Sequence, residues 1–229
     1  MFASAAVAMP PDVKAARLHW SGSGQAFVLQ SLGETAVIGG SGEQYGLLER
    51  LGELLQYRTR TLDLVVVTDD RAANLSGLEG LVRHYRIREV LDVGLQYPSL
   101  GYAQWRDSLG RAHIPVYALR TGTSITMGTA NLTAIGPDGV CGVPADCAGM
   151  MRITVPKKSY LITGDASQKE QREALFRPVK LSADVLLGDG THDFLADFVR
   201  AVHPQLVETY GTRMAGGTRH LPNGLSESL

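Results

Sequence analysis

The stretch from Leu62 to Leu78, which reads LDLVVVTDDRAANLSGL, constrains the fold more than any other part of the chain. It begins with a short apolar run rich in β-branched residues, which predicts a buried strand. Ser76 and Glu79 then form an S-x-x-E pattern, which predicts that a helix begins after Ser76. A polar loop that joins the carboxyl end of a buried strand to a helix is where α/β folds place their chemistry.

The polar residues of this loop allow two interpretations. Asp69, Asp70 and Asn74 lie where a site of chemistry would be expected. Asp and Asn are also common turn and cap residues, because their short side chains bond to nearby backbone groups. The loop alone does not decide between the two, so the order of the remaining elements has to be considered.

The rest of the chain alternates between two kinds of segment. Two β-rich meanders, at 16–38 and 121–163, lack crossover helices between their strands, and each is followed by alternating strands and helices. This order predicts an α/β (α+β) fold, a four-layer αββα sandwich of two mixed sheets with helices outside. The predicted helices span 43–57, 77–85, 102–109, 168–176 and 193–202. The predicted strands span 16–20, 25–30, 35–38, 62–68, 88–93, 114–119, strand pairs within 121–136, 150–155, 159–163, 184–187 and 205–210.

Composition and motifs exclude several classes of protein. The 229 residues are 44% hydrophobic and 20% charged, as in globular proteins. A net charge of −1 predicts no strong general affinity for nucleic acid. The chain contains no P-loop, no G-x-G-x-x-G and no G-x-S-x-G motif, and its six histidines show no H-x-H or H-E-x-x-H spacing. No apolar stretch is long enough to cross a bilayer.

The two cysteines, Cys141 and Cys147, lie six positions apart in the loop CGVPADC. They lack partners for a metal site, because there is no other Cys and no close His. A disulfide is expected if the domain lies outside the cytoplasm, and two unpaired thiols are the alternative.

Six short pieces of the chain follow one another in a recognisable order. They are WSGSGQA (20–26), VIGG (37–40), VTDDRAANLSGL (67–78), LITGD (161–165), LLGDGTHD (186–193) and His203-Pro204 before the last strand. In order and spacing, these pieces resemble the metallo-β-lactamase superfamily. More closely, they resemble the soluble domain of the ComEC family of competence proteins, which carry DNA across the cell membrane. The resemblance extends from about residue 16 to residue 211.

The resemblance also implies where the superfamily's metal ligands would fall, and most of these positions carry other residues. In the main loop, the family's His and Asp ligands fall on Asp69, Arg71, Ala73 and Asn74. A guanidinium has no lone pair to donate and repels a divalent cation, so Arg71 would pair with Asp165 instead.

The other ligand positions follow the same pattern. The Asp of the family's LIDGG falls on Gly39, and the Asp of its GQGD falls on Gln25. The two His of the family's HHGS turn fall on or near Gly190 and Thr191, with Asp189 and His192 flanking them. Of the acids of the metal site, only Asp165 is clearly kept.

These departures favour a scaffold or binding domain whose binuclear metal site has been lost, with no cofactor. Residues 1–13 are then disordered or the end of a preceding membrane segment, residues 14–211 form the metallo-β-lactamase-like domain, and residues 212–229 form a flexible tail. The resemblance implies an extracytoplasmic domain of a cell-membrane protein; without it, the domain is expected to be soluble. The implied partners are single-stranded DNA and the membrane-channel part of a longer parent protein.

Two alternatives remain open. In the first, carboxylates at the strand ends hold one divalent ion, Mn, Mg or Zn, and the domain is a metal-dependent hydrolase or nuclease. The residues that this alternative uses are Asp69, Asp70, Asp165, Asp189 and His192. In the second, a basic face binds nucleic acid. The arginines that it would use are Arg58, Arg60, Arg83, Arg86 and Arg88.

Overall fold

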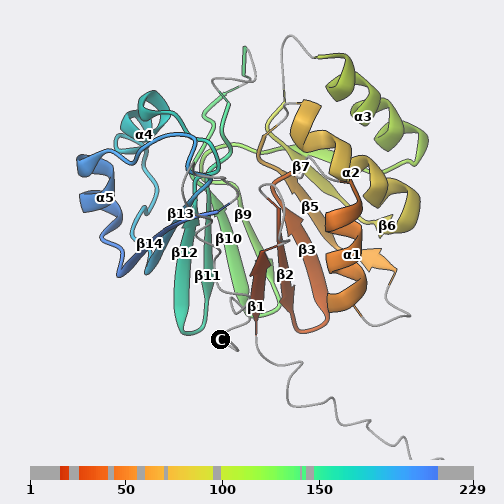
Figure 1. Ribbon diagram of the computed structural model, residues 1–229, viewed down its shortest axis with the longest axis horizontal. Helices are drawn as coiled ribbons and strands as arrows, with labels where there is room; N and C mark the ends of the chain where they lie inside the picture. The colour runs from red at the N-terminus through yellow and green to blue at the C-terminus, as the bar shows by residue number, and fades with distance from the viewer. Residues whose placement is uncertain are drawn as a thin grey trace, which may run out of the picture.

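Two six-stranded mixed sheets face each other in the computed structural model, with helices on both outer faces (Figure 1). The structure describes residues 16–20, 26–40, 44–55, 60–69, 72–94, 99–139, 141–142 and 147–210. The segments predicted as a leading segment (1–13) and a flexible tail (212–229) therefore lie outside the described residues. The two sheets and the outer helices confirm the predicted αββα arrangement.

The first sheet has the order β1-β2-β3-β5-β7-β8, and β3, β5, β7 and β8 run parallel. Its strands are β1 (Arg17–Trp20), β2 (Phe27–Ser31), β3 (Glu34–Ile38), β5 (Leu64–Val67), β7 (Val90–Asp92) and β8 (Val116–Ala118). A small parallel pair lies beside it, formed by β4 (Thr61–Leu62) and β6 (Arg86–Ile87).

The second sheet has the order β14-β13-β12-β11-β10-β9, and β12, β13 and β14 run parallel. Its strands are β9 (Ser124–Met127), β10 (Ala130–Ala134), β11 (Met151–Val155), β12 (Lys158–Ile162), β13 (Val185–Gly188) and β14 (Leu206–Thr209). The first sheet is built wholly from residues before 119 and the second wholly from residues after 123.

Three apolar layers hold the sandwich together. Alternate residues of the two sheets meet in a central core, which includes Phe27, Leu132 and Ile153. The outer face of the first sheet is covered by α1 (Gln44–Leu54), α2 (Ala72–His84) and α3 (Leu100–Arg111). The outer face of the second sheet is covered by α4 (Gln168–Ala174) and α5 (Ala196–Val202). The inner parallel strands β5 and β13 are covered on both faces, so they consist of continuous runs of buried residues such as Leu64–Val67.

The structure corrects the predicted start of the helix in the opening stretch. α2 begins at Ala72, so Ser76 lies inside the helix and is not its N-cap. The capping box predicted at Ser167 and Glu170 is confirmed, with both reciprocal hydrogen bonds present at the start of α4. The box predicted at Ser41 lies outside the described residues.

Candidate functional site

The carboxyl ends of the parallel strands of both sheets meet at one edge of the sandwich (Figure 1). Two backbone hydrogen bonds join the segments that follow these strands. Gly149 N–H donates to Thr68 O (2.7 Å), and Asp189 N–H donates to Gly164 O (3.1 Å). The first bond links the end of β5 in the first sheet to the segment that leads into β11 in the second. We call this edge the strand-end site.

Three of the predicted acids lie at the strand-end site. Asp69 follows β5 and is 2% exposed, and Asp189 follows β13 and is 7% exposed. Asp165 lies just beyond β12 and is half-buried. Carboxylates that are this buried need hydrogen-bond or charge partners, and all three have interactions.

The Asp189 carboxylate is held by its own turn. Its Oδ1 accepts a hydrogen bond from Thr191 N–H (2.8 Å), and its Oδ2 accepts one from the Thr191 hydroxyl (2.8 Å). Each oxygen therefore accepts one hydrogen bond within the turn and keeps a further lone pair for another partner. His192, the next residue, is exposed, so the turn does not direct it into the buried part of the site.

Tyr210 is the residue of this site that sequence reasoning missed. It follows β14 and is 2% exposed, and its ring packs edge-on against Phe27 at 5.0 Å between centroids. Burial, and then the negative charges of Asp189, Asp165 and Asp69, raise the pKa of the Tyr210 hydroxyl well above its usual value.

A further buried acid, Asp92, ends β7 at the same edge and was not predicted as a site residue. It accepts hydrogen bonds from Tyr102 Oη (2.9 Å), Gly94 N–H (2.9 Å) and Arg106 (3.2 Å). Burial, followed by the Asp92 charge and its hydrogen bond, raises the pKa of Tyr102 to about 12. Because every oxygen of Asp92 is satisfied, this group fixes α3 to the sheet.

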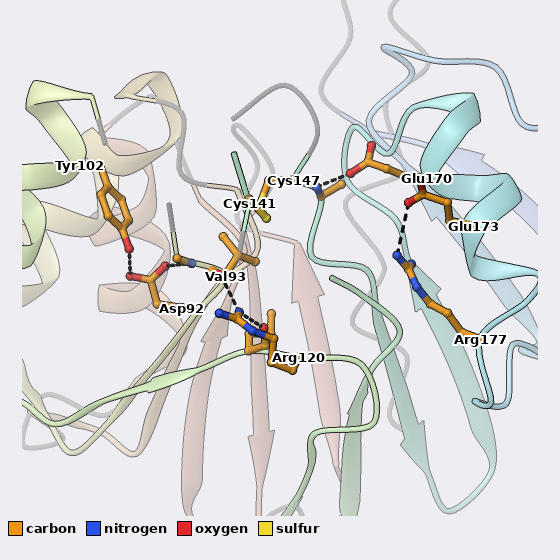
Figure 2. The surroundings of a disulfide bond; sticks show 12 residues. Asp92, Val93, Tyr102, Arg120, Cys141, Cys147, Glu170, Glu173 and Arg177 are labelled. Carbon is orange, nitrogen blue, oxygen red and sulfur yellow. Dashed lines mark hydrogen bonds and ion pairs between the residues drawn. A yellow bond between two sulfur atoms is a disulfide. The ribbon is translucent and has the colours of Figure 1, made fainter. Parts of the chain in front are cut away.

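The two cysteines form a disulfide, which decides between the two possibilities left by the sequence. Figure 2 shows the bond between the Asp92 group and α4. Directly after Cys147, the backbone N–H of Ala148 donates to Glu170 Oε1 (2.6 Å), so the end of the disulfide loop is tied to α4. In this way, the disulfide and Glu170 hold Cys147 and Ala148 in place between the two sheets' helical and strand elements.

The remaining predicted residues are only partly described. Asp70 and Arg71 lie outside the described residues, and of Asn74 the structure describes only the backbone, in the first turn of α2. At Gly39, where the resemblance implies an aspartate, φ is +91°, a backbone conformation that favours glycine.

A metal ion needs several His, Cys, Asp or Glu side chains that converge on one point. In the part of the chain that the structure describes, no group of three or more His, Cys, Asp or Glu side chains is placed to hold a metal ion. At the strand-end site, Asp189 accepts hydrogen bonds from Thr191, and burial together with the neighbouring acids raises the pKa of the Tyr210 hydroxyl.

Comparison with solved structures identifies the fold. The chain is similar to CmlA, a diiron β-hydroxylase from Streptomyces venezuelae, with a TM-score of 0.56 and 15% identity, over 89% of this chain and 45% of CmlA. It is also similar to the metallo-β-lactamase fold protein YhfI from Bacillus subtilis, with a TM-score of 0.52 and 14% identity, over 87% of this chain and 95% of YhfI.

A variant of the Cronobacter sakazakii metallo-β-lactamase aligns with a TM-score of 0.51 and 13% identity, over 77% of this chain and 79% of that one. No protein-family model and no curated protein matches the sequence. The chain has the metallo-β-lactamase fold, and it spans less than half the length of CmlA. Within the described residues, no helix has both the length and the apolar character needed to span a membrane.

Proposed function

We propose that this chain is the metallo-β-lactamase-fold domain of a ComEC-type DNA-uptake protein, and that it acts as a scaffold or binding domain without a pair of metal ions. The observation that carries the proposal is the chemistry of the strand-end site. There, the Thr191 backbone and hydroxyl hold Asp189, and a neutral Tyr210 lies buried near the acids. The order of the sequence pieces, from WSGSGQA to His203-Pro204, supports the ComEC assignment.

The disulfide supports a position outside the cytoplasm. Disulfides persist in oxidising compartments and are rare where thioredoxin and glutathione keep thiols reduced. Cys141 and Cys147 are both buried and bonded to each other, as expected for a domain on the outer side of the membrane. The partners would then be single-stranded DNA and the membrane channel of a longer parent protein.

Metal content tests the proposal directly. We expect the purified protein, analysed by mass spectrometry after incubation with Mn and Zn and then desalting, to carry far less than one ion per chain. The double variant Asp165→Ala/Asp189→Ala is the matched control and should give the same low value. Near-stoichiometric Mn or Zn that disappears in the double variant would overturn the proposal.

A metal-dependent hydrolase or nuclease is the second candidate. Asp69, Asp165 and Asp189 lie close enough to Tyr210 to raise its pKa together, so their charges converge at this edge. One hard ion such as Mg²⁺ or Mn²⁺ could be held by such oxygens once a ligand replaces the Thr191 contacts. Cleavage of single-stranded DNA with Mg, Mn or Zn, abolished by Asp165→Ala, would support this candidate, and no cleavage with any of the three would exclude it.

A further inference from the structure

The outer helical face of the molecule carries a polar pocket that the strand-end site does not use. It lies between α2 and α3 and has a volume of about 290 Å³. Its lining residues are Glu79, Val82, Arg83, Gln104, Ser108 and Arg111. Arg83 lies 11 positions along α2 from Ala72, which corresponds to about 16 Å of helix, so the pocket is remote from the strand-end site.

Two guanidinium groups of this pocket are available to a ligand. Arg83 is exposed, and no carboxylate pairs with it among the described residues. Arg111 pairs with Asp107 at 3.0 Å, but both side chains are mostly exposed, and an exposed pair of this kind contributes only about 0–1 kcal/mol. Arg111 can therefore exchange Asp107 for a ligand oxygen at little cost.

The positive charge continues beyond the pocket. Arg86 follows three positions after Arg83 and begins β6, where its N–H donates to Arg60 O at 2.7 Å. That bond brings Arg60 and Arg86, both exposed, to the same end of the β4–β6 pair. The exposed arginines form a row from α3 across α2 to β6, which we call the arginine row: Arg60, Arg83, Arg86 and Arg111.

We propose that the arginine row binds the phosphate backbone of a single nucleic-acid strand, with one nucleotide unit seated in the α2–α3 pocket. Arginine guanidinium groups match phosphate oxygens in geometry and charge. Gln104 supplies hydrogen-bonding groups for the sugar or base. The Ser108 hydroxyl donates to Trp105 O (2.7 Å), so its oxygen is left to accept, as does Glu79, from ligand N–H or O–H donors. The pocket is at the lower end of the size range of ligand pockets, about 300–1,000 Å³, so it takes one unit of a chain.

This inference rests on the proposed function and deepens it, since a DNA-uptake domain needs a surface that contacts single-stranded DNA. The proposed function and this inference can nevertheless be disproved separately. The metal measurement tests the strand-end site, whereas the DNA-binding measurement tests Arg83 and Arg111, and Arg83 lies about 16 Å along α2 from that site. A protein that holds a metal ion and binds a strand through the arginine row would overturn the first proposal alone.

The test is fluorescence anisotropy of a labelled single-stranded DNA oligonucleotide at a series of salt concentrations. We expect the double variant R83A/R111A to bind at least about tenfold more weakly at low salt, because two phosphate contacts are lost. The slope of log affinity against log salt should fall by about 1.4, that is, about 0.7 for each contact.

The matched control is R172A/R200A, which removes two exposed arginines from α4 and α5 on the opposite outer face. It lowers the net charge by the same amount and should keep the wild-type salt slope. Glu79→Gln should tighten binding, because it removes a negative charge next to the phosphates. Equal salt slopes for the two double variants, no binding by the wild type, or complete displacement of the strand by inorganic phosphate at constant ionic strength would each overturn the inference.

Discussion

His19 lies on β1, beneath α1, and only 4% of its surface is exposed. Both ring nitrogens lack a hydrogen-bond partner among the described residues. Burial, followed by the positive charges of Arg50 and Arg17, lowers the pKa of His19 from 6.5 to about 4. The folded protein therefore holds a neutral imidazole at any pH above about 4, whereas the unfolded chain begins to protonate it below 6.5.

The consequence is a loss of stability in acid. Because the pKa is lower in the folded state, the contribution of His19 is fully present above pH 6.5 and is lost as the pH falls towards 4. The free energy of unfolding should drop by about 2.5 kcal/mol between pH 7 and pH 4.5 through this residue alone. Urea unfolding at the two pH values measures the drop, and His19→Leu should remove it.

The exposed His84 of α2 provides the control for this prediction. His84→Leu should keep the wild-type difference between pH 7 and pH 4.5, because this side chain is exposed to solvent in the folded protein. An unchanged difference in His19→Leu would show that other groups cause the acid loss.

At the scale of elements, the sequence predicted the helices and strands that have strong periodicity or a capping motif. It missed the elements that form only through tertiary contacts. The strand at Leu64–Val67 and the capping box at Ser167 were predicted because their signals are local. β6 was missed, since two residues carry no periodicity and Arg86–Ile87 is a strand only by pairing with β4. The start of α2 was misplaced because Ser76 matches a cap pattern inside the helix.

The candidate site was predictable to a similar extent. Asp69, Asp165 and Asp189 lie at strand ends as expected, because each follows a strand that the sequence shows clearly. Tyr210 was missed, because nothing local indicates that a tyrosine near the end of the chain packs on Phe27 and faces those acids. Asp92 was missed as well, since its partner Tyr102 lies in a separate element, and α3 brings it back to the end of β7.

The side chain of Glu170 both caps the short helix α4 and links it to the segment after Cys147. Glu170 is 5% exposed, and its Oε2 accepts from Ser167 N–H and hydroxyl (both 2.8 Å) while its Oε1 accepts from Ala148 N–H (2.6 Å). Glu170→Ala should lower the free energy of unfolding by about 3 kcal/mol, because it leaves the buried N–H of Ala148 and the capping N–H of Ser167 without acceptors.

Chemical denaturation of the variant measures this loss. Glu173→Ala is the control on the same helix, because that carboxylate is exposed and pairs with Arg177 at 3.6 Å. Its loss should be at most about 1 kcal/mol. Similar losses in the two variants would mean that the link from α4 to the disulfide loop contributes little.

For the whole molecule, the disulfide makes stability depend on the redox state of the surroundings. The bond closes a loop between positions six apart, and a loop of this length predicts a stabilisation of about 2 kcal/mol by restricting the unfolded chain. The free energy of unfolding of the wild-type protein should therefore fall by about that amount when a reductant is added.

Denaturant unfolding with and without dithiothreitol measures this effect. The double variant Cys141→Ala/Cys147→Ala should give the same curve under both conditions, because it has no bond to reduce. Two free thiols titrated in the unfolded, untreated protein would contradict the prediction, since the two cysteines of the chain are expected to be bonded.

The chain passes from the first sheet to the second once, between β8 and β9. Each sheet can therefore form from its own half of the chain. Contacts within one half close shorter loops of chain than contacts between the two halves. The entropy of closing a loop rises with its length, so pairing within a half is favoured before contact between the halves. In folding terms, the central core around Phe27 and Ile153 behaves as a docking interface between two subdomains, formed late and shared by both.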